Sequence, residues 1–338
     1  MTRSQQNSAR IVVVIVNFNA GEHLQRALDA VALQTLRPSR VIVVDNASTD
    51  GSAGHLQESH PFVEVLTSGR NLGFAAANNL GARQAPECEW IALLNPDAFP
   101  EPEWLEHTVR CAKKQMPQVA AFGARLLMAE TPHVLDGTGD MYHTSGFAWR
   151  RHHGIPEDRV SNTPDEVLGV CAAAACFRRN AWDTVGGFDE QFFCYYEDVD
   201  LALRLLLAGF RCMSVPDARV HHVGSAVTGR ESDFTIYHVQ RNLVWTFVKN
   251  MPGGLFWRYL PQHVAVNLLA VLWFGLRGQL RPVLRAKRDA VRGLGPTIRE
   301  RHRLQRRRVV RPRDFRAQLA KGLIGYRTAA ERARLLDT

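Results

Sequence analysis

Ile11-Val-Val-Val-Ile-Val16 is an unbroken run of β-branched residues near the start of this 338-residue chain. Such side chains favour extended backbone, and an uninterrupted apolar run is typical of a parallel strand buried on both faces. Polar side chains follow at once, in Asn17-Phe18-Asn19. The stretch predicts a buried strand whose carboxyl end carries groups that can bind a ligand.

The next eighty residues repeat this pattern of buried strand, polar turn and helix. Apolar runs at 41–44, 63–66 and 90–94 alternate with segments of helical spacing. Turn formation alone explains the polar residues after any one strand, but four strands with the same feature favour a shared crevice at one sheet edge. No glycine-rich dinucleotide or P-loop signature is present. We therefore expect an α/β fold with a doubly wound, mostly parallel sheet.

Carboxylates are concentrated in the segment 188–201, where Glu197, Asp198 and Asp200 follow an aromatic run. They begin a segment that is expected to be a helix closed by Gly209. Acidic residues in a first helical turn can simply complement the helix dipole. The aromatic residues before them instead favour a carboxylate in a partly dry cleft, where its pKa rises and it can accept a proton.

Positive charge is concentrated at the carboxyl end. Residues 277–338 contain 19 Lys and Arg but 5 Asp and Glu, a net charge of +14, whereas the preceding residues carry −5. This asymmetry predicts an acidic partner, either anionic lipid or nucleic acid. Nucleic acid is disfavoured because aromatic residues are not interleaved with the arginines. The six cysteines have no metal-ligand spacing and are expected to be reduced thiols of a cytoplasmic protein.

An apolar segment, 256–276, precedes the basic tail. Its nearly uncharged part, 263–276, has 14 residues, fewer than the ~20 that a membrane-spanning helix requires. Trp257 and Trp273 suit the membrane–water boundary. The segment and the tail together predict peripheral attachment to an anionic membrane. A basic helix packed on the acidic body is the alternative.

The middle of the chain has weaker patterns. Residues 133–153 are rich in Gly, His, Trp and Arg, and are expected to form solvated loops. His143, His152 and His153 lack metal-ligand spacing. An acceptor-binding flap is the alternative interpretation.

An ordered set of motifs over residues 11–225 resembles glycosyltransferase family 2, and in particular its rhamnosyltransferase-like members. Each motif is weak alone, but their order is specific. The motifs are Val16-Asn-Phe-Asn19, Val44-Asp-Asn-Ala-Ser-Thr-Asp-Gly51, Asn71-Leu-Gly-Phe74, Leu94-Asn-Pro-Asp97, Gly186-Gly-Phe-Asp-Glu190 and Glu197-Asp-Val-Asp-Leu201.

The resemblance implies a GT-A (nucleotide-diphospho-sugar transferase) fold that binds the donor at the ends of its first strands. Phe18 would lie near the base, Asp45 would accept a hydrogen bond from a pyrimidine N3–H, and Arg70 would lie close to the diphosphate. The implied donor-binding set is Asn17, Phe18, Asn19, Asp45, Asn46, Arg70, Asn71, Asn95 and Asp97.

The resemblance also implies a divalent metal, Mn²⁺ or Mg²⁺, held by Asp97 and by His222 of a His-x-Gly element, with His221 as the alternative. Asn95 stands at the first position of an Asp-x-Asp element. Its neutral oxygen is expected to weaken metal binding. An imidazole ligand favours Mn²⁺.

Asp198 would be the catalytic base by the same resemblance, with Glu197 as the alternative, since adjacent carboxylates titrate together. The acceptor-binding residues are expected to be Trp182, Tyr196 and Asp200. The alternative role for Asp200 is structural, in an ion pair with Arg204, four residues later.

The expected function is an inverting glycosyltransferase. It would move rhamnose from dTDP-rhamnose, or a sugar from a UDP-sugar, to a hydroxyl of a glycan or polyprenyl-linked acceptor. The expected location is peripheral, at the cytoplasmic face of the inner membrane. A non-catalytic scaffold that binds nucleotide sugars is the alternative.

The expected domains are a disordered segment 1–10, a GT-A domain 11–225 with donor half 11–115 and acceptor half 116–225, and a helical, basic, membrane-associating region 226–338.

Overall fold

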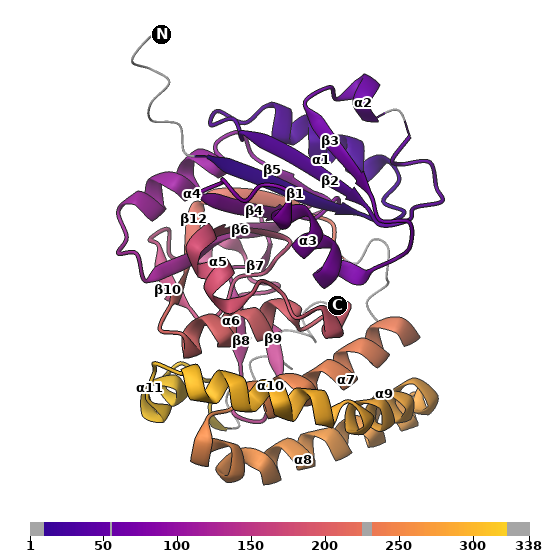
Figure 1. The fold of residues 1–338 in the computed structure, drawn as a ribbon, viewed down its shortest axis with the longest axis vertical. Helices are drawn as coiled ribbons and strands as arrows, with labels where there is room; N and C mark the ends of the chain where they lie inside the picture. The colour runs from indigo at the N-terminus through magenta and orange to yellow at the C-terminus, as the bar shows by residue number, and fades with distance from the viewer. Residues whose placement is uncertain (1–9, 55, 225–231, 323–338) are drawn as a thin grey trace.

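The computed structural model describes residues 10–54, 56–224 and 232–322. The disordered segment expected at the N-terminus, apart from Arg10, lies outside these residues. The first third of the chain alternates strands and helices as predicted (Figure 1). Its elements are β1 (Ile11–Asn17), α1 (Glu22–Ala32), β2 (Arg40–Asp45), α2 (Leu56–Ser59), β3 (Val63–Thr67), α3 (Gly73–Arg83), β4 (Trp90–Leu94), β5 (Ala98–Pro100) and α4 (Trp104–Lys113).

The middle third completes the sheet and contains the acidic helix. Its elements are β6 (Val119–Met128), β7 (Leu135–Gly137), β8 (Asp140–Tyr142), β9 (Ala148–Arg150), β10 (Asp165–Val167), β11 (Ala174–Arg178), α5 (Arg179–Val185), α6 (Glu197–Leu207) and β12 (Arg211–His222). The helix α6 ends as predicted, because Gly209 has a φ of 91° and the amide of Phe210 donates to the Leu205 carbonyl at 2.9 Å.

One mixed sheet has the strand order β10-β12-β6-β11-β4-β1-β2-β3, with β5 beside β12 and β7 beside β6. The strands β3, β2, β1 and β4 are parallel, and β11 runs antiparallel between β4 and β6. The two strands β8 and β9 form a separate hairpin. The predicted α/β class is therefore confirmed, with antiparallel pairing among the strands that follow β4.

Apolar side chains bury both faces of the sheet. Val13 and Ile15 of β1 pack with α1 and α4, whereas Val12 and Val14 point the other way and pack with α3, α5 and α6. An unbroken β-branched run supplies both faces at once, which explains why β1 lies in the centre of the sheet.

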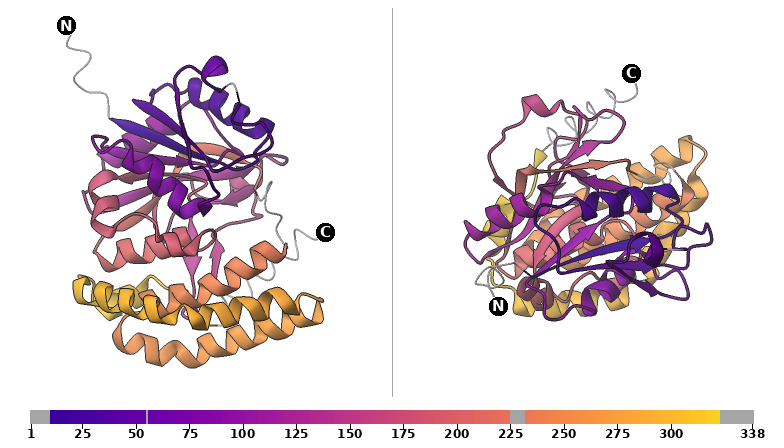
Figure 2. Two further views of the ribbon diagram at one scale, coloured as in Figure 1. Left: turned by 45° about the vertical axis from the view of Figure 1, so that its right-hand side comes forward. Right: turned by 90° about the horizontal axis from the view of Figure 1, so that it is seen from above.

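In the described residues after β12, five helices form a layer below the sheet (Figure 2). They are α7 (Asp233–Asn250), α8 (Gly253–Leu276), α9 (Leu280–Arg292), α10 (Leu294–Arg307) and α11 (Pro312–Ala317). A third apolar cluster joins this layer to the sheet-containing part of the chain, because Leu203 and Leu207 of α6 pack with Leu243 and Phe247 of α7. The predicted boundary at residues 225 and 226 lies outside the described residues.

The helix α8 corrects one expectation about the apolar segment. It is 24 residues long and continues through Pro261, so it measures about 36 Å at 1.5 Å per residue. Within the described residues it is the one helix whose length and composition would allow it to cross a membrane. The segment is therefore not too short to span a bilayer, because helical structure begins ten residues before the uncharged part.

Candidate active site

A cavity of about 640 Å³ lies at the carboxyl edge of the parallel strands. The strand ends of β1, β2 and β4, the start of α6, the β8–β9 hairpin and the end of β12 all contribute to its lining. Nine of the residues predicted from the sequence line it together: Phe18, Asn46, Asn71, Asn95, Asp97, Tyr196, Glu197, Asp198 and His222. The cavity therefore lies at the carboxyl ends of the strands, where the sequence predicted a crevice.

Asn17 and Asp45 lie behind the cavity wall and order the loops that form it. The two residues are paired in register at the ends of β1 and β2, and the Asn17 amide donates to Asp45 Oδ1 at 3.1 Å. The same amide donates to the hydroxyls of Ser48 at 3.0 Å and Ser52 at 2.9 Å. Neither Asn17 nor Asp45 contributes to the cavity lining described above.

Asn46 and Asn71 fix the next loop in the same way, with Asn46 Nδ2 donating to Asn71 Oδ1 at 2.9 Å. Asn19 has a φ of 50° and accepts a hydrogen bond from the Thr49 amide at 2.8 Å. Arg70 is exposed and, like Asn19, is not among the lining residues. Apart from Arg70, the predicted donor set thus divides into residues that face the cavity and residues that support its loops.

Asp97 and His222 face each other across the predicted metal position. His222 Nε2 lies 3.4 Å from Asp97 Oδ1, and both side chains are almost fully buried. Burial alone would raise the pKa of Asp97, but the neighbouring His222 ring and backbone hydrogen bonds, among them one from the Gly224 amide, lower it. His221, on the same strand, contacts Glu101 at 3.2 Å and is not part of the lining, so this placement favours His222 over His221 as the ligand.

Asp136 sets the orientation of His222 and was missed by sequence reasoning. His222 Nδ1 lies 2.7 Å from Asp136 Oδ2. A carboxylate accepts the hydrogen of Nδ1–H, which leaves the lone pair of Nε2 pointing at the cavity. Arg150 forms an ion pair with Asp136. Although burial opposes it, this charge holds the pKa of Asp136 well below its usual range.

The donor atoms present fit a divalent cation that is completed by substrate. His222 Nε2 and Asn95 Oδ1 are buried and have no hydrogen-bond partner among the described residues. No cluster of three or more His, Cys, Asp and Glu side chains in the described ranges is placed to hold a metal. The chain supplies two or three ligand atoms here, so diphosphate oxygens would have to supply others.

Asp198 faces the cavity from the first turn of α6. Asp198 is partly exposed, whereas the neighbouring Glu197 is 6% exposed and its Oε2 has no partner among the described residues. Burial raises the pKa of Asp198, opposed by the Val199 amide and the positive charge of Arg150. Burial and the charge of Asp198 raise the pKa of Glu197 well above its usual value. Of the two, Asp198 is the better placed to accept a proton from a ligand.

The backbone directly before these carboxylates is strained. Phe193, Tyr195 and Tyr196 all have a φ between 66° and 69°, which is costly for residues with side chains. Asn242 of α7 holds this backbone, because its amide donates to the carbonyls of Cys194 at 2.9 Å and Tyr195 at 2.7 Å. The C-terminal helical layer thus supports the start of α6.

The β8–β9 hairpin forms one wall of the cavity, and its residues correct the solvated-loop expectation. Asp140, Phe147 and Trp149 line the cavity, and the two aromatic rings stack with centroids 5.9 Å apart. His143 in the hairpin turn is fully buried. Burial and the nearby Asp198 raise the pKa of Asp140 well above its usual value. The acceptor-flap interpretation fits this arrangement.

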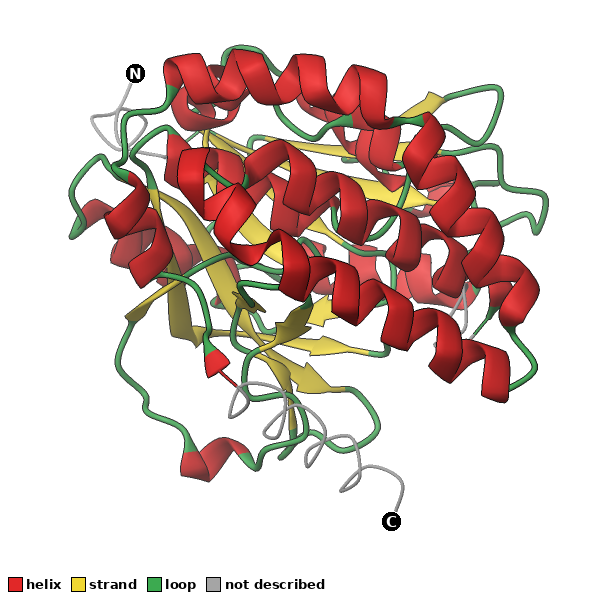
Figure 3. Cartoon of the chain, turned by 90° about the horizontal axis from the view of Figure 1, so that it is seen from below, coloured by secondary structure: helices red, strands yellow, loops and turns green. Residues whose placement is uncertain are grey.

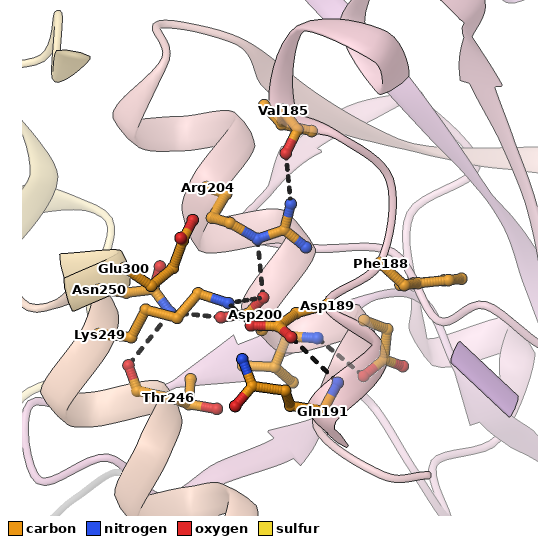
Figure 4. A network of polar contacts seen from close by, with 12 residues as sticks. Val185, Phe188, Asp189, Gln191, Asp200, Arg204, Thr246, Lys249, Asn250 and Glu300 are labelled. Atoms are coloured by element: carbon orange, nitrogen blue, oxygen red, sulfur yellow. Dashed lines mark hydrogen bonds and ion pairs between the residues drawn. The ribbon is translucent and has the colours of Figure 1, made fainter. Parts of the chain in front are cut away.

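Two of the predicted acceptor residues lie elsewhere. Trp182 is buried on α5, where it packs between Phe177 and Phe188. Asp200 is fully buried and accepts from Arg204 at 2.7 Å, Lys249 at 2.8 Å and Asn250 at 2.7 Å (Figure 4). Neither residue lines the cavity, so the prediction that they bind the acceptor there is corrected.

Tyr196, the third predicted acceptor residue, lines the cavity and also holds the hairpin. Its hydroxyl accepts a hydrogen bond from the Ala148 amide at 3.1 Å and donates to the Gly146 carbonyl at 3.4 Å. It therefore connects the start of α6 with the flap.

Known proteins resemble this chain in sequence and in fold. Residues 12–186 match the model of glycosyl transferase family 2. The N-acetylglucosaminyl-diphospho-decaprenol L-rhamnosyltransferase of Mycobacterium tuberculosis is 31% identical over 241 residues, which cover 65% of this chain and 78% of the relative.

Two solved structures share the fold. GalNAc-T7 with UDP, GalNAc and Mn²⁺ superposes with a TM-score of 0.59 at 17% identity, over 72% of this chain and 48% of that chain. This chain thus spans about half of GalNAc-T7. The mannosyltransferase PcManGT from Pyrobaculum calidifontis, in complex with GDP-Man and Mn²⁺, superposes with a TM-score of 0.52 at 20% identity, over 88% of this chain and 86% of that chain.

Proposed function

The chain belongs to glycosyl transferase family 2 and is a glycosyltransferase, and on that premise we propose that it is an inverting, metal-assisted transferase acting on a lipid-linked acceptor. The donor would be a pyrimidine nucleoside diphosphate sugar, dTDP-rhamnose or a UDP-sugar. The main support for the proposal is that one cavity is lined by the strand-end amides, the Asp97–His222 pair and the partly exposed Asp198.

Asp198 is the proposed general base. The acceptor hydroxyl gives its proton to the Asp198 carboxylate as its oxygen attacks the anomeric carbon of the donor sugar. The bond from that carbon to the diphosphate oxygen breaks, and the nucleoside diphosphate leaves with the bonding electrons. Attack from the side opposite the leaving group inverts the anomeric centre. A positioned carboxylate contributes roughly 10²–10⁴-fold to such a step.

The donor occupies the strand-end side of the cavity in this proposal. Phe18 contacts the base, and Asn46 and Asn71 form the loop beside it, while Asn17, Asn19 and Asp45 keep these loops in shape. Arg70 is exposed at the same edge and would reach the donor only if its side chain turns towards the diphosphate.

Asp97, His222 and the carbonyl oxygen of Asn95 would hold Mn²⁺ or Mg²⁺ together with diphosphate oxygens. When bound, the cation supplies Lewis-acid stabilisation of the charge on the leaving diphosphate. Asp136 would keep His222 oriented for this role.

The acceptor is proposed to be a sugar on a polyprenyl diphosphate, in keeping with the name of the mycobacterial relative. The β8–β9 hairpin and Tyr196 would shape its subsite. The division into a GT-A domain at 11–225 and a membrane-associating region at 226–338 remains part of this proposal, as does a location at the cytoplasmic face of the inner membrane.

A donor screen tests the proposal. Purified protein is incubated with a panel of nucleotide sugars with Mn²⁺ or with EDTA, and nucleoside diphosphate release is measured. We expect release from one pyrimidine donor, and loss of that release in EDTA. Release that is equally fast in EDTA would remove the metal from the proposal, and release from no donor would oppose the proposed donor class.

A further inference from the structure

The helix α8 is apolar on the side that faces away from the protein. Trp257, Val264, Leu268, Leu272 and Leu276 recur at helical spacing and are between 47% and 79% exposed. Helices of soluble proteins normally turn such a stripe towards the core. A contiguous exposed apolar stripe of this kind indicates a contact with an apolar partner.

The opposite side of α8 carries the polar residues and packs on the body. Gln262 accepts a hydrogen bond from Thr144 at 3.0 Å, and His263 Nδ1 contacts the Ser145 carbonyl at 2.7 Å. The His263 ring also stacks on Phe247 with centroids 4.0 Å apart. These contacts come from the middle of the helix, so α8 is attached to the protein along its centre.

A further contact at Asn267 joins α8 to α9. Asn267 Oδ1 accepts from Lys287 Nζ at 2.5 Å, and Lys287 also donates to Gln240 of α7 at 2.8 Å. If α8 crossed a bilayer, these groups would enter a hydrocarbon core about 30 Å thick, together with α7, α9 and the hairpin turn. The length of α8 allows a crossing, but its contacts are compatible only with a helix that lies flat.

Charge distinguishes between the apolar partners that could cover this stripe. Between Gly253 and Arg299 the sequence has one acidic residue, Asp289, and its carboxylate already accepts from Arg288 at 2.9 Å and from Tyr237 at 3.1 Å. Six exposed arginines lie on α8, on α9 or at the turn between them, at positions 258, 277, 281, 285, 288 and 292. A second copy of this chain would bring these cations together, whereas anionic lipid headgroups would neutralise them.

We propose that the exposed faces of α8 and α9 form a membrane-docking surface that lies in the plane of an anionic bilayer. The surface consists of the α8 stripe with Trp273, of Leu280 and Leu284 on α9, and of the six exposed arginines of these two helices and their turn. The apolar side chains enter the boundary between headgroups and acyl chains, and the arginines contact the phosphates. These helices lie at the bottom of the molecule in Figure 1, and Figure 3 shows the helical layer from that side.

If the chain acts on a lipid-linked acceptor as proposed, this orientation would bring the cavity close to that acceptor. The turn of the β8–β9 hairpin rests on α8 through Thr144 and Ser145. The cavity wall begins two residues later, at Phe147. A sugar diphosphate whose prenyl chain is in the bilayer would therefore reach the cavity from the side on which the protein docks.

Vesicle co-sedimentation of the full chain tests the surface. Vesicles of phosphatidylcholine with phosphatidylglycerol are compared with vesicles of phosphatidylcholine alone. We expect binding that requires the anionic lipid and that falls at least about tenfold in Leu268→Glu/Leu272→Glu. Leu33→Glu and Met116→Glu alter side chains that are equally exposed, at 69% each, but lie in the sheet domain, and they are expected to bind as wild type does.

Depth-dependent quenching tests the orientation. Val264→Trp is placed in a Trp257→Phe/Trp273→Phe background and read with lipids brominated at shallow or deep positions of the acyl chain. A helix in the membrane plane predicts stronger quenching by the shallow bromines. Stronger quenching by the deep bromines would show a helix that crosses the bilayer and would overturn the proposal.

Two other outcomes would also overturn it. One is the absence of vesicle binding by wild type; the other is a wild-type dimer that the Leu268→Glu/Leu272→Glu variant loses while vesicle binding is unchanged. Thermal unfolding of each variant shows that the fold is intact. Donor hydrolysis, which needs no membrane, is measured on the same samples, so loss of docking and failure of the proposed chemistry are distinguished.

Discussion

The imidazole of His222 hydrogen-bonds through Nδ1 to the carboxylate of Asp136, at 2.7 Å. The two residues are 86 positions apart in the sequence, on β12 and β7. This contact fixes which ring nitrogen faces Asp97 and the cavity. It makes Asp136 a positioning residue for the proposed metal site.

The first prediction concerns Asp136→Asn. An amide is a weaker acceptor than a carboxylate and no longer fixes the ring, so affinity for Mn²⁺ in the presence of nucleoside diphosphate should fall about 10–100-fold. Titration of free Mn²⁺ by electron paramagnetic resonance measures it. His221→Gln is the matched control, because that ring contacts Glu101 instead. Unchanged Mn²⁺ affinity in Asp136→Asn would show that the contact does not serve a metal.

The second prediction concerns pH. Because burial raises the pKa of Asp198 and Arg150 opposes this rise, removing the Arg150 charge should raise it further. Transfer needs the ionised carboxylate, so the rate rises with pH through this pKa. Arg150→Gln should move the acid limb of kcat/KM to higher pH, by about one to three units.

Arg150→Lys keeps the positive charge and is the control, with an acid limb close to that of wild type. Both variants disturb the Asp136 ion pair, so a loss of rate common to both is separated from the pH shift. An acid limb that is the same in Arg150→Gln and wild type contradicts the assignment.

The third prediction concerns the buried network around Asp200. Asp200→Asn removes the charge that compensates Arg204 and Lys249. Lys249 keeps Asp189 as a partner, but the buried Arg204 guanidinium loses its carboxylate, which should cost about 3–5 kcal/mol of unfolding free energy. Urea denaturation measures it. Asp189→Asn alters a more exposed partner of Lys249 and should cost about 1 kcal/mol. Equal losses of unfolding free energy in the two variants would contradict this prediction.

This contribution also has a defined pH dependence. Burial would raise the pKa of Asp200, but Lys249 and Arg204 outweigh it and lower the pKa. A lowered pKa in the folded state means that the stabilisation is present above the ordinary aspartate pKa of about 3.9 and is lost as the pH falls through the folded value. Wild type and Asp200→Asn should therefore converge in stability only in acid below that range.

The proposed donor side of the cavity could be predicted from the sequence, because local patterns determine the strands that form it. A strand buried on both faces has an unmistakable apolar run, and its carboxyl end is defined by the first polar residue, as at Asn17 and Asp45. Parallel strands then bring these ends together without further information. Which of the polar residues face the cavity depends on side-chain hydrogen bonds between loops, which no local pattern encodes.

The proposed acceptor side was harder to predict from the sequence, because its residues are brought together by tertiary packing and not by local patterns. Asp136, Asp140 and Arg150 lie on strands of three residues each, too short for a periodic pattern, and they meet His222 or Asp198 only through tertiary packing. The direction of the Asp200 side chain, in contrast, could have been predicted from the sequence. Two residues of helix rotate the side chain by about 200°, so Asp200 must point away from Asp198, towards Arg204 and the core.

The central claim is that Asp198 is the base, and the turnover of Asp198→Asn tests it most directly. Asp217→Asn, an exposed aspartate on β12, serves as the control. With the donor identified by the hydrolysis screen and a prenyl-diphosphate sugar as acceptor, the account predicts a kcat about 10²–10⁴-fold lower in Asp198→Asn. Calorimetry should give an unchanged affinity for the nucleoside diphosphate. A kcat equal to that of wild type in Asp198→Asn would contradict the account.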